Sequence, residues 1–254
     1  MEIKNKIRNI MMFIPTRTKK RLSENLRKYQ RIVKSATAKD INESDTSLIV
    51  TDMLCDILGY DKYTEITTES AIRGTFCDLA VSINKKIKLL LELKAIGLDL
   101  KDYHIKQAID YAANKGIDWV ILTNAREWHI YKVSFTKPIN KELVSQFALE
   151  DLSPRLEKDL EMLFSLTKEG LAKSALSDYY DQSQTTNRYV LGNLLMSDEV
   201  IDVLRREVKK LFPKTRIDTE EIRETLSKNV IKREILEGEE ADLARKKLKK
   251  KVRK

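Results

Sequence analysis

Residues 77–97 read CDLAVSINKKIKLLLELKAIG and place three charged residues in an otherwise apolar stretch. Two runs, FCDLAVSI and IKLLLELK, flank the polar letters NKK, which predicts a β-hairpin. Each strand then has one fully apolar face, and Asp78, Glu92 and Lys94 fall on the other face. Burying an ionised group costs several kcal/mol unless it is paired or binds a metal. The three charges therefore either face solvent or form a site.

The register of the hairpin decides whether the two acids meet. With a loop at residues 84–86, Ile83 pairs with Ile87, and counting back places Asp78 opposite Glu92. Directly opposed side chains have Cβ atoms roughly 5 Å apart. This register also matches the apolar faces of the two strands, and we therefore expect it.

A second register remains open. A two-residue turn at Lys85-Lys86 shifts the pairing by one, so that Asp78 lies nearest Leu93 and one acid is buried. A structure with Asp78 and Glu92 on opposite faces would leave all three charges as solvated surface residues of an ordinary α/β protein. A surface ion pair of Glu92 with Lys94 contributes well under ~1 kcal/mol.

The expected register predicts a metal site. Two adjacent carboxylates repel each other unless a cation lies between them. Two carboxylates, a main-chain carbonyl and several waters suit Mg²⁺ or Mn²⁺. Lys94 then stands beside the ion, where an ammonium group stabilises charge on a phosphate oxygen. Asp78, Glu92 and Lys94 together indicate a site that cleaves phosphodiesters.

The helix expected after the hairpin adds two polar residues. His104, Gln107, Ala108 and Tyr111 share one helical stripe. Gln107 and Tyr111 are four residues apart, so an amide and a phenol can reach one point beside the acidic face. The alternative is that Tyr111 is ordinary core and Gln107 ordinary surface.

The fold class follows from the order of the expected elements. The chain reads α-β-β-β-α-β-β through residue 133, which predicts an α/β protein with a mixed sheet flanked by helices. Strands are expected at residues 63–70, 76–83, 87–94, 118–124 and 127–133. Residues 1–40 form an N-terminal helical segment, 41–136 the α/β core, and 137–254 a helical C-terminal region.

Three local signals mark helix ends in these parts. Asn42 is a good N-cap for a helix that Gly59 ends. Ser153 and Pro154 predict a helix start in the C-terminal region. The last residues, ARKKLKKKVRK, carry no acid and form either a solvated, frayed end or a nucleic-acid-binding arm.

Composition narrows the partners. The 254 residues carry a net charge of +9, which favours a polyanion such as nucleic acid, although a solvated lysine-rich surface explains the charge equally well.

No apolar run is long enough to span a bilayer, and no signal peptide is recognisable. The 2 cysteines suit a reducing cytosol, so a cytoplasmic location is expected. The sequence contains neither the P-loop motif GxxxxGK[ST] nor the dinucleotide-binding motif GxGxxG, which argues against a nucleotide-driven motor within these residues.

The motif Asp78, then Glu92-Leu93-Lys94, then QAIDY at 107–111 resembles the PD-(D/E)xK nuclease superfamily. The segments NESDTSLIVTDMLCDILGYD, LLLELKAIGLDL and HIKQAIDYAANKGIDWVILTNAREWHIYKV are similar to the N-terminal nuclease domain of type I restriction enzyme R subunits. The resemblance covers roughly residues 42–133 and implies a restriction-endonuclease-like fold.

The resemblance also implies roles for single residues. Asp78 and Glu92 would be metal ligands, Lys94 the catalytic lysine, and Gln107 and Tyr111 motif residues at the site. Glu43 matches an additional acidic, metal-binding position, with Asp45 as a nearby alternative. The implied cofactor is Mg²⁺ or Mn²⁺, and the implied partners are nucleic acid, with DNA favoured, and separate restriction-system subunits.

Two functions remain open at this level. The first is a metal-dependent deoxyribonuclease that uses the complete set of two acids and a lysine. The second is a nucleic-acid-binding or assembly module that keeps the nuclease fold without cleavage. The resemblance supports the nuclease core but not ATP-driven restriction, and it leaves the helical C-terminal region without a role.

Overall fold

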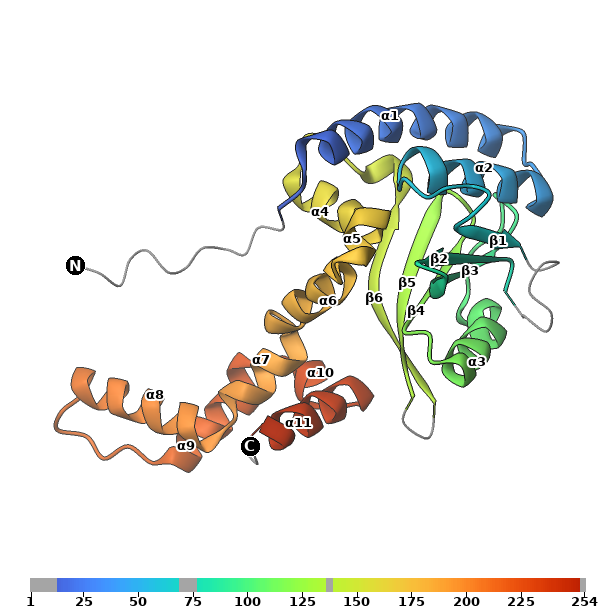
Figure 1. The fold of residues 1–254 in the computed structure, drawn as a ribbon. Helices are drawn as coiled ribbons and strands as arrows, with labels where there is room; N and C mark the ends of the chain where they lie inside the picture. The colour runs from blue at the N-terminus through green and yellow to red at the C-terminus, as the bar shows by residue number, and fades with distance from the viewer. Residues whose placement is uncertain (1–12, 69–76, 136–138, 252–254) are drawn as a thin grey trace. The chain divides into compact units, whose positions relative to one another are not determined.

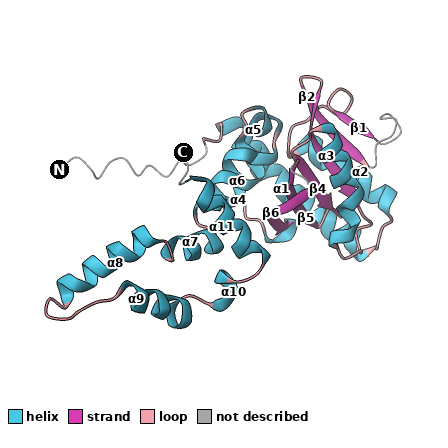
Figure 2. Cartoon of the chain, turned by 90° about the horizontal axis from the view of Figure 1, so that it is seen from below, coloured by secondary structure: helices cyan, strands magenta, loops and turns pink. Residues whose placement is uncertain are grey.

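A computed structural model describes residues 13–68, 77–135 and 139–251 (Figure 1). The chain divides into two compact units, Met1–Tyr179 and Tyr180–Lys254. The expected class is confirmed, because the first unit holds a mixed sheet flanked by helices and the C-terminal part is helical (Figure 2). None of the described helices is long and apolar enough to cross a membrane.

The sheet of the first unit has six strands in the order β1-β2-β3-β4-β5-β6. Only β3 and β4 run parallel among the described strands, and helix α3 forms the crossover between them. The strands are β1 (Ile66–Thr68), β2 (Leu79–Ile83), β3 (Lys86–Leu93), β4 (Trp119–Thr123), β5 (Glu127–Ser134) and β6 (Asn140–Ala148). The expectation of a strand over 63–70 and of Phe76 in β2 lies partly outside the described residues.

Helices cover both faces of this sheet. Helix α3 (Lys106–Lys115), preceded by the 3₁₀ turn η2 (Asp102–Ile105), packs its apolar stripe on one face against β2, β3, β4 and β5. On the other face, α2 (Glu43–Asp56) and α4 (Glu157–Leu166) meet the β5 and β6 side chains, with Met53, Leu163, Trp128 and Phe147 lining one small apolar pocket. The long helix α1 (Thr16–Ala38) lies against α2 and α4 (Figure 1).

The structure corrects the expected turn of the hairpin. The loop consists of Asn84 and Lys85 alone, both with positive φ (52° and 62°), so Ile83 pairs with Lys86 and not with Ile87. Positive φ at both central positions is the type I′ geometry that matches the twist of a hairpin. Neither expected turn is therefore present.

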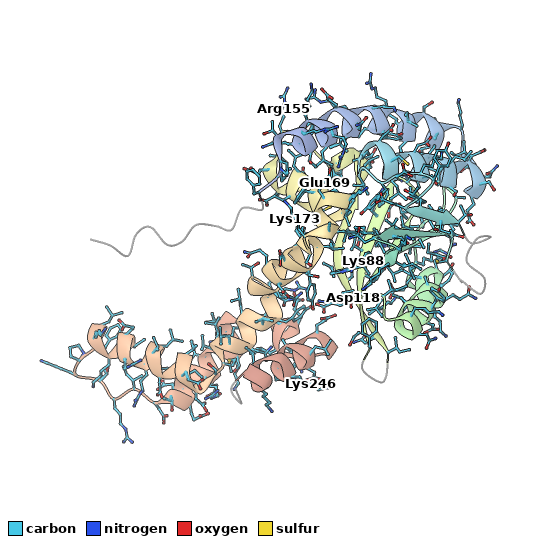
Figure 3. All side chains as sticks on the ribbon, in the orientation of Figure 1. Lys88, Asp118, Arg155, Glu169, Lys173 and Lys246 are labelled. Carbon is cyan, nitrogen blue, oxygen red and sulfur yellow. The ribbon has the colours of Figure 1, made fainter. Side chains whose placement is uncertain are left out.

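A β-bulge then restores the expected register. Pairing shifts between Val81 and Ser82, because Ser82 faces Ile87 whereas Val81 faces Leu89, which leaves Lys88 as the extra residue. Beyond the bulge, Leu79 faces Leu91. Lys88 and Asp118 directly precede Leu89 and Trp119, the first residue pair of the parallel strands β3 and β4 (Figure 3). Glu92 lies near the other end of this pairing, opposite Leu122.

Two other expectations about residues 137–254 are wrong. This region begins with a strand, β6, which pairs with β5 over its whole length. The helix start expected at Ser153-Pro154 is a turn, in which the amide of Leu156 bonds to the carbonyl of Ser153, and α4 begins at Glu157. The Ser153 hydroxyl accepts from the Arg155 amide and so stabilises that turn.

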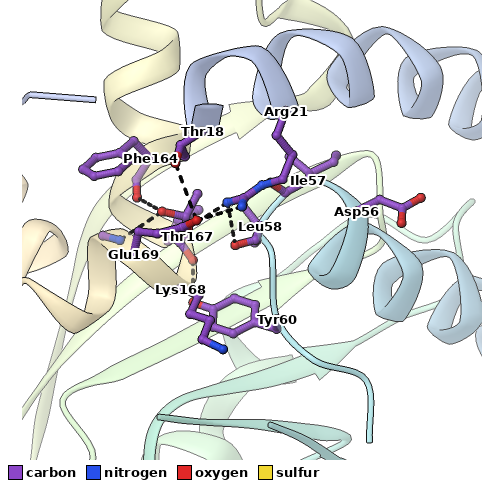
Figure 4. A network of polar contacts seen from close by, with 12 residues as sticks. Thr18, Arg21, Asp56, Ile57, Leu58, Tyr60, Phe164, Thr167, Lys168 and Glu169 are labelled. Carbon is purple, nitrogen blue, oxygen red and sulfur yellow. Dashed lines mark hydrogen bonds and ion pairs between the residues drawn. The ribbon is translucent and has the colours of Figure 1, made fainter. Parts of the chain in front are cut away.

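A polar clamp joins three helical segments of the first unit (Figure 4). The guanidinium of Arg21 on α1 donates to the carbonyls of Ile57 and Leu58 after α2, and to both carboxylate oxygens of Glu169 on α5 (Lys168–Ala172). Gly59, at φ +83°, leaves the space for this guanidinium, since a Cβ there would lie 2.6 Å from it. The expected end of α2 near Gly59 is confirmed, as is its Asn42 N-cap.

The second unit consists of short helices. Helix α6 (Ala175–Thr185) crosses the boundary between the units. The others are α7 (Arg188–Leu195), α8 (Asp198–Leu211), α9 (Thr219–Thr225), the π turn η4 (Leu226–Val230), α10 (Arg233–Leu236) and α11 (Glu239–Lys251). Helices α7 and α10 approach closely at Gly192, where a Cβ would lie 2.4 Å from the Ile235 side chain.

Candidate active site

The carboxyl end of β3 carries two of the expected site residues on one face. Leu90 is buried in the cluster beneath α3, and alternation along the strand puts Glu92 and Lys94 on the same side. Leu91 and Leu93 are buried on the other side. The side chains of Glu92 and Lys94 are only 14% and 17% exposed, so both charges are largely removed from water.

Asp78 lies across from Glu92. Its amide donates to the carbonyl of Leu91 (3.1 Å), and its carboxylate accepts from the amide of Leu93 (2.6 Å). These two hydrogen bonds hold Asp78 to the residues on either side of Glu92. Regular pairing of β2 with β3 stops at Leu79, one residue short of Asp78. Beyond that point the Leu93 amide donates to the Asp78 side chain and not to a main-chain carbonyl.

The Lys94 ammonium is surrounded by oxygen atoms. It lies 2.8 Å from Oε1 of Glu92, 2.5 Å from the carbonyl oxygen of Leu93 and 3.9 Å from Oε2 of Glu43. Burial acts to lower the pKa of Lys94, but the hydrogen bond to Glu92 and the charges of Glu92, Glu43 and Asp78 outweigh it and raise the pKa above its ordinary value. Lys94 is therefore a firmly protonated cation.

Glu92, in contrast to Lys94, is a group whose charged form is disfavoured. Burial raises its pKa to about 7, against the lowering effect of the Lys94 hydrogen bond, and the charges of Asp78 and Glu43 add to the rise. Its carboxylate is thus destabilised by two neighbouring acids. A cation that binds between the acids removes that penalty.

Glu43 reaches this site from the first turn of α2. The Asn42 side chain caps the helix by accepting from the Asp45 amide, and the hydroxyl of Thr46 accepts from the amide of Ile96 (3.1 Å). The second bond ties the start of α2 to the loop that follows Lys94. Glu43 remains 52% exposed, which places it at the rim of the site.

The two polar residues on α3 are less closely attached. Tyr111 is half-buried against the cluster that contains Cys77, and burial followed by the Cys77 charge raises its pKa. Gln107 is exposed, and its side chain makes no hydrogen bond to any described residue. The structure brings Tyr111 close to Cys77, the residue before Asp78, and leaves Gln107 at the surface.

His104 is a neighbour of the site for which the sequence pattern indicated no role. Burial, and then the charges of Lys94 and Lys101, lower its pKa, while Glu43 acts in the opposite direction. Its Nδ1 accepts from the amide of Lys101 (3.0 Å), which leaves the proton of the neutral ring on Nε2. Its position three residues before Gln107 on one stripe was the signal in the sequence.

The donor set fits a hard divalent cation. Among the described residues, no group of three or more His, Cys, Asp or Glu could hold a metal ion, so Asp78, Glu92 and Glu43 do not form a three-carboxylate cage. The Lys94 ammonium nevertheless bonds to the carboxylate and carbonyl oxygens that such an ion prefers. Mg²⁺ commonly binds through one or two carboxylates and keeps several waters.

A comparison with protein families bears on this site. Residues 49–145 match the type I restriction enzyme R protein N terminus. The resemblance inferred from the sequence is thereby confirmed for a segment that holds Asp78, Glu92, Lys94, Gln107 and Tyr111. Glu43 lies before its start. No curated protein and no solved structure matches the chain.

Proposed function

We propose that the first unit is a divalent-metal-dependent nuclease that hydrolyses phosphodiester bonds in DNA, with Mg²⁺ or Mn²⁺ as its metal. The convergence of Asp78, Glu92 and Lys94 at the end of β3 carries the proposal. The match to a restriction-enzyme family supports DNA as the substrate class and separate restriction-system subunits as partners.

The metal would be held by the carboxylates of Asp78 and Glu92 and by the carbonyl of Leu93. When bound, a divalent ion supplies Lewis-acid chemistry, because it lowers the pKa of water and neutralises charge on a phosphate. Glu92 must be ionised to hold the ion, so its pKa of about 7 makes occupation of the site dependent on pH.

Lys94 acts as a hydrogen-bond donor and not as a base. Its pKa is raised, so the ammonium keeps its proton at neutral pH. Glu92 and the Leu93 carbonyl, which the Lys94 ammonium now contacts, would hold the ion, and Lys94 would then be free to donate to a non-bridging phosphate oxygen. There it stabilises the negative charge that grows as water attacks phosphorus.

The remaining residues have supporting roles in this proposal. Glu43 at the rim orients a water molecule or the Lys94 ammonium. Gln107 and Tyr111 on α3 contact the bound phosphate backbone or support Asp78. None of these residues is required to hold the metal.

A second function is favoured by one observation. The Lys94 ammonium already bonds to Glu92 and to the Leu93 carbonyl, so these two oxygen ligands have a cationic partner without a metal. A nucleic-acid-binding or assembly module that does not cleave its ligand would keep this arrangement. Binding that falls steeply with salt but ignores Mg²⁺ and Asp78→Asn would favour it.

A cleavage assay separates the two functions. The purified chain is incubated with Mg²⁺, Mn²⁺ or EDTA and with double-stranded DNA, single-stranded DNA or RNA. We expect metal-dependent cutting of DNA, and we expect Lys94→Ala to lower its rate by roughly 10²-fold or more. Lys88→Ala is the matched control, because Lys88 is an exposed lysine at the other end of the same strand. Intact substrates with both metals, or equal cutting by Lys94→Ala, would show the nuclease proposal to be wrong.

A further inference from the structure

The surface of α1 beside the 3₁₀ turn η3 (Leu149–Asp151) is hollowed. One cavity of about 580 Å³ is lined by Arg27, Gln30, Arg31, Lys34 and Glu150. A second cavity of about 330 Å³ shares Gln30, Lys34 and Glu150 and extends to Arg126, in the turn before β5, and to Glu127, the first residue of β5. We call these two adjoining cavities the α1 groove.

The groove has fixed walls. Helix α1 buries the stripe Leu22, Leu26, Tyr29 and Val33, and this anchors the helix to the unit. The Gln30 amide donates to the carbonyls of Leu149 (2.9 Å) and Leu152 (2.8 Å), which ties α1 to the opposite wall. The polar side chains of the groove therefore project from a rigid frame.

The cations of the groove lack acidic partners. Arg27, Arg31 and Lys34 form no ion pair with any described residue, although Glu150 lines the same cavity. Their neighbours on α1 differ, because Arg21 pairs with Glu169 and Lys28 with Asp56. Like charges four residues apart on a helix destabilise it. A row of unpaired cations is thus costly for the isolated protein and suits an anionic ligand.

The spacing of these cations fits a nucleic-acid strand. Arg27, Arg31 and Lys34 lie on one side of the helix and span seven residues, which is ~10 Å along its axis. One strand of a DNA duplex rises about 3.4 Å per phosphate, so that length matches about three phosphates. The groove exposes few apolar side chains, whereas a protein partner needs an apolar anchor.

The groove also leads toward the candidate active site. The Arg126 guanidinium at its end lies 3.5 Å from the carbonyl of Ile96, two residues after Lys94. The same loop is tied to the start of α2 through Ile96 and Thr46. A strand held along α1 as far as Arg126 therefore reaches a side chain that contacts the loop after Lys94.

From these observations we infer that the α1 groove binds the sugar–phosphate backbone of duplex DNA, with Arg27, Arg31, Lys34 and Arg126 as the phosphate contacts. This inference rests on the proposed function for the choice of DNA. Binding here is independent of base sequence, because all four contacts are cations that meet phosphates. Glu150 and Glu127 oppose binding, since both acids line the groove.

The test measures binding without cleavage. A fluorescein-labelled 25-base-pair duplex is titrated with the full chain in EDTA at several salt concentrations, and anisotropy gives the affinity. The variant Arg27→Gln/Arg31→Gln/Lys34→Gln is compared with Lys85→Gln/Lys86→Gln/Lys88→Gln, which removes the same charge from the exposed hairpin at the far end of β3. We expect the groove variant to bind at least tenfold more weakly than this control and to lower the salt slope by up to about 2.7.

The variant Glu150→Gln is expected to change the affinity for the duplex in the opposite direction. Removing this carboxylate should tighten binding severalfold, and this arm decides the matter if the triple groove variant fails to fold. Equal affinities for the groove and hairpin variants, no tightening by Glu150→Gln, or no duplex binding by the wild type would each overturn the inference. So would competition by polyglutamate as effective as that by DNA, which would indicate an acidic protein partner. Loss of cleavage with these binding results intact would refute only the proposed nuclease activity.

Discussion

The amide of Leu93 donates a 2.6 Å hydrogen bond to the carboxylate of Asp78. This bond fixes the first acid of the site against the strand that carries Glu92 and Lys94. Asp78 therefore has a structural role in addition to its proposed role as a metal ligand. The two roles respond differently to substitution.

Asp78→Asn is expected to separate them. The amide side chain keeps an oxygen that can accept from Leu93, so the free energy of unfolding should fall by no more than about 1 kcal/mol. Asp78→Ala leaves the Leu93 amide without an acceptor and should cost roughly 1–3 kcal/mol. Urea unfolding measures both values. Cleavage should be lost in both variants, because neither retains the charge that a divalent ion needs.

Full cleavage by Asp78→Asn would contradict the metal-ligand role. Equal stability of the asparagine and alanine variants would contradict the structural role. Each outcome leaves the other role intact, so the pair of variants tests them independently.

Glu92 predicts a pH dependence of stability. Its pKa is about 7 in the folded protein and 4.5 as the ordinary value. Because the folded state binds the proton more tightly, this group's stabilising contribution is fully present below pH 4.5 and is lost as the pH rises through 7. The full change corresponds to roughly 3 kcal/mol.

The measurement compares wild type with Glu92→Gln in EDTA from pH 4.5 to pH 8. The wild type should lose stability relative to the variant as the pH rises, because glutamine cannot ionise. Other titrating groups are common to both proteins and largely cancel, and Lys94 stays charged over this range. A stability difference that does not change with pH would show that Glu92 is not destabilised by burial. Excess Mg²⁺ should reduce the slope if the ion binds the carboxylate.

The sequence was sufficient for the faces of the hairpin but not for its turn. Strand alternation correctly placed Glu92 and Lys94 on the face opposite to Leu91 and Leu93. It could not reveal the bulge at Lys88, because a positive-φ turn at Asn84-Lys85 and an extra residue in β3 compensate each other. Counting residues from a three-residue loop therefore gave the correct pairing of Asp78 with Glu92, but the pairing results from a two-residue turn and a bulge.

Strand β6 was missed for a related reason. Its residues, NKELVSQFA, alternate only weakly, and none of them is fully buried. Pairing with β5 stabilises this strand more than its own sequence pattern does. His104 was expected on one helical stripe with Gln107 and Tyr111, but it lies in the 3₁₀ turn η2, and only the fold brings it within the electrostatic influence of Lys94.

The Arg21 clamp predicts a stability effect far from the site. Arg21→Lys keeps the charge but loses the planar fork that bonds both oxygens of Glu169 at 2.8 Å and two carbonyls after α2. The hydrogen bond from Arg21 also lowers the pKa of Glu169 below its ordinary value. We expect a loss of about 1–3 kcal/mol in urea unfolding.

Lys28→Ala is the control for this clamp. The Lys28–Asp56 ion pair is short at 2.6 Å, but its side chains are 49% and 41% exposed. Solvent-exposed pairs contribute within about 1 kcal/mol. A larger loss for Lys28→Ala than for Arg21→Lys would contradict the view that the fork geometry stabilises this junction.

Gly170 provides the sharpest steric prediction in the same region. A Cβ at this position would lie 2.0 Å from the carbonyl oxygen of Phe164, and that carbonyl already accepts from the hydroxyl of Thr167 (2.7 Å). The Gly170 amide donates to the same hydroxyl (3.0 Å), so neither partner can move freely. Gly170→Ala should therefore cost at least about 2 kcal/mol in the free energy of unfolding.

Gly116→Asn is the matched comparison, because it tests backbone conformation without a clash. Gly116 ends α3 at φ +69°, and a Cβ at this position would have no described atom within 4 Å. Asparagine tolerates this conformation better than most residues, so the cost should stay near or below ~1 kcal/mol. Since Gly170 adjoins Glu169, its substitution should also weaken the Arg21 clamp, and Arg21→Lys should add little to a Gly170→Ala background. Fully additive losses in the double variant would show that the glycine and the clamp are independent.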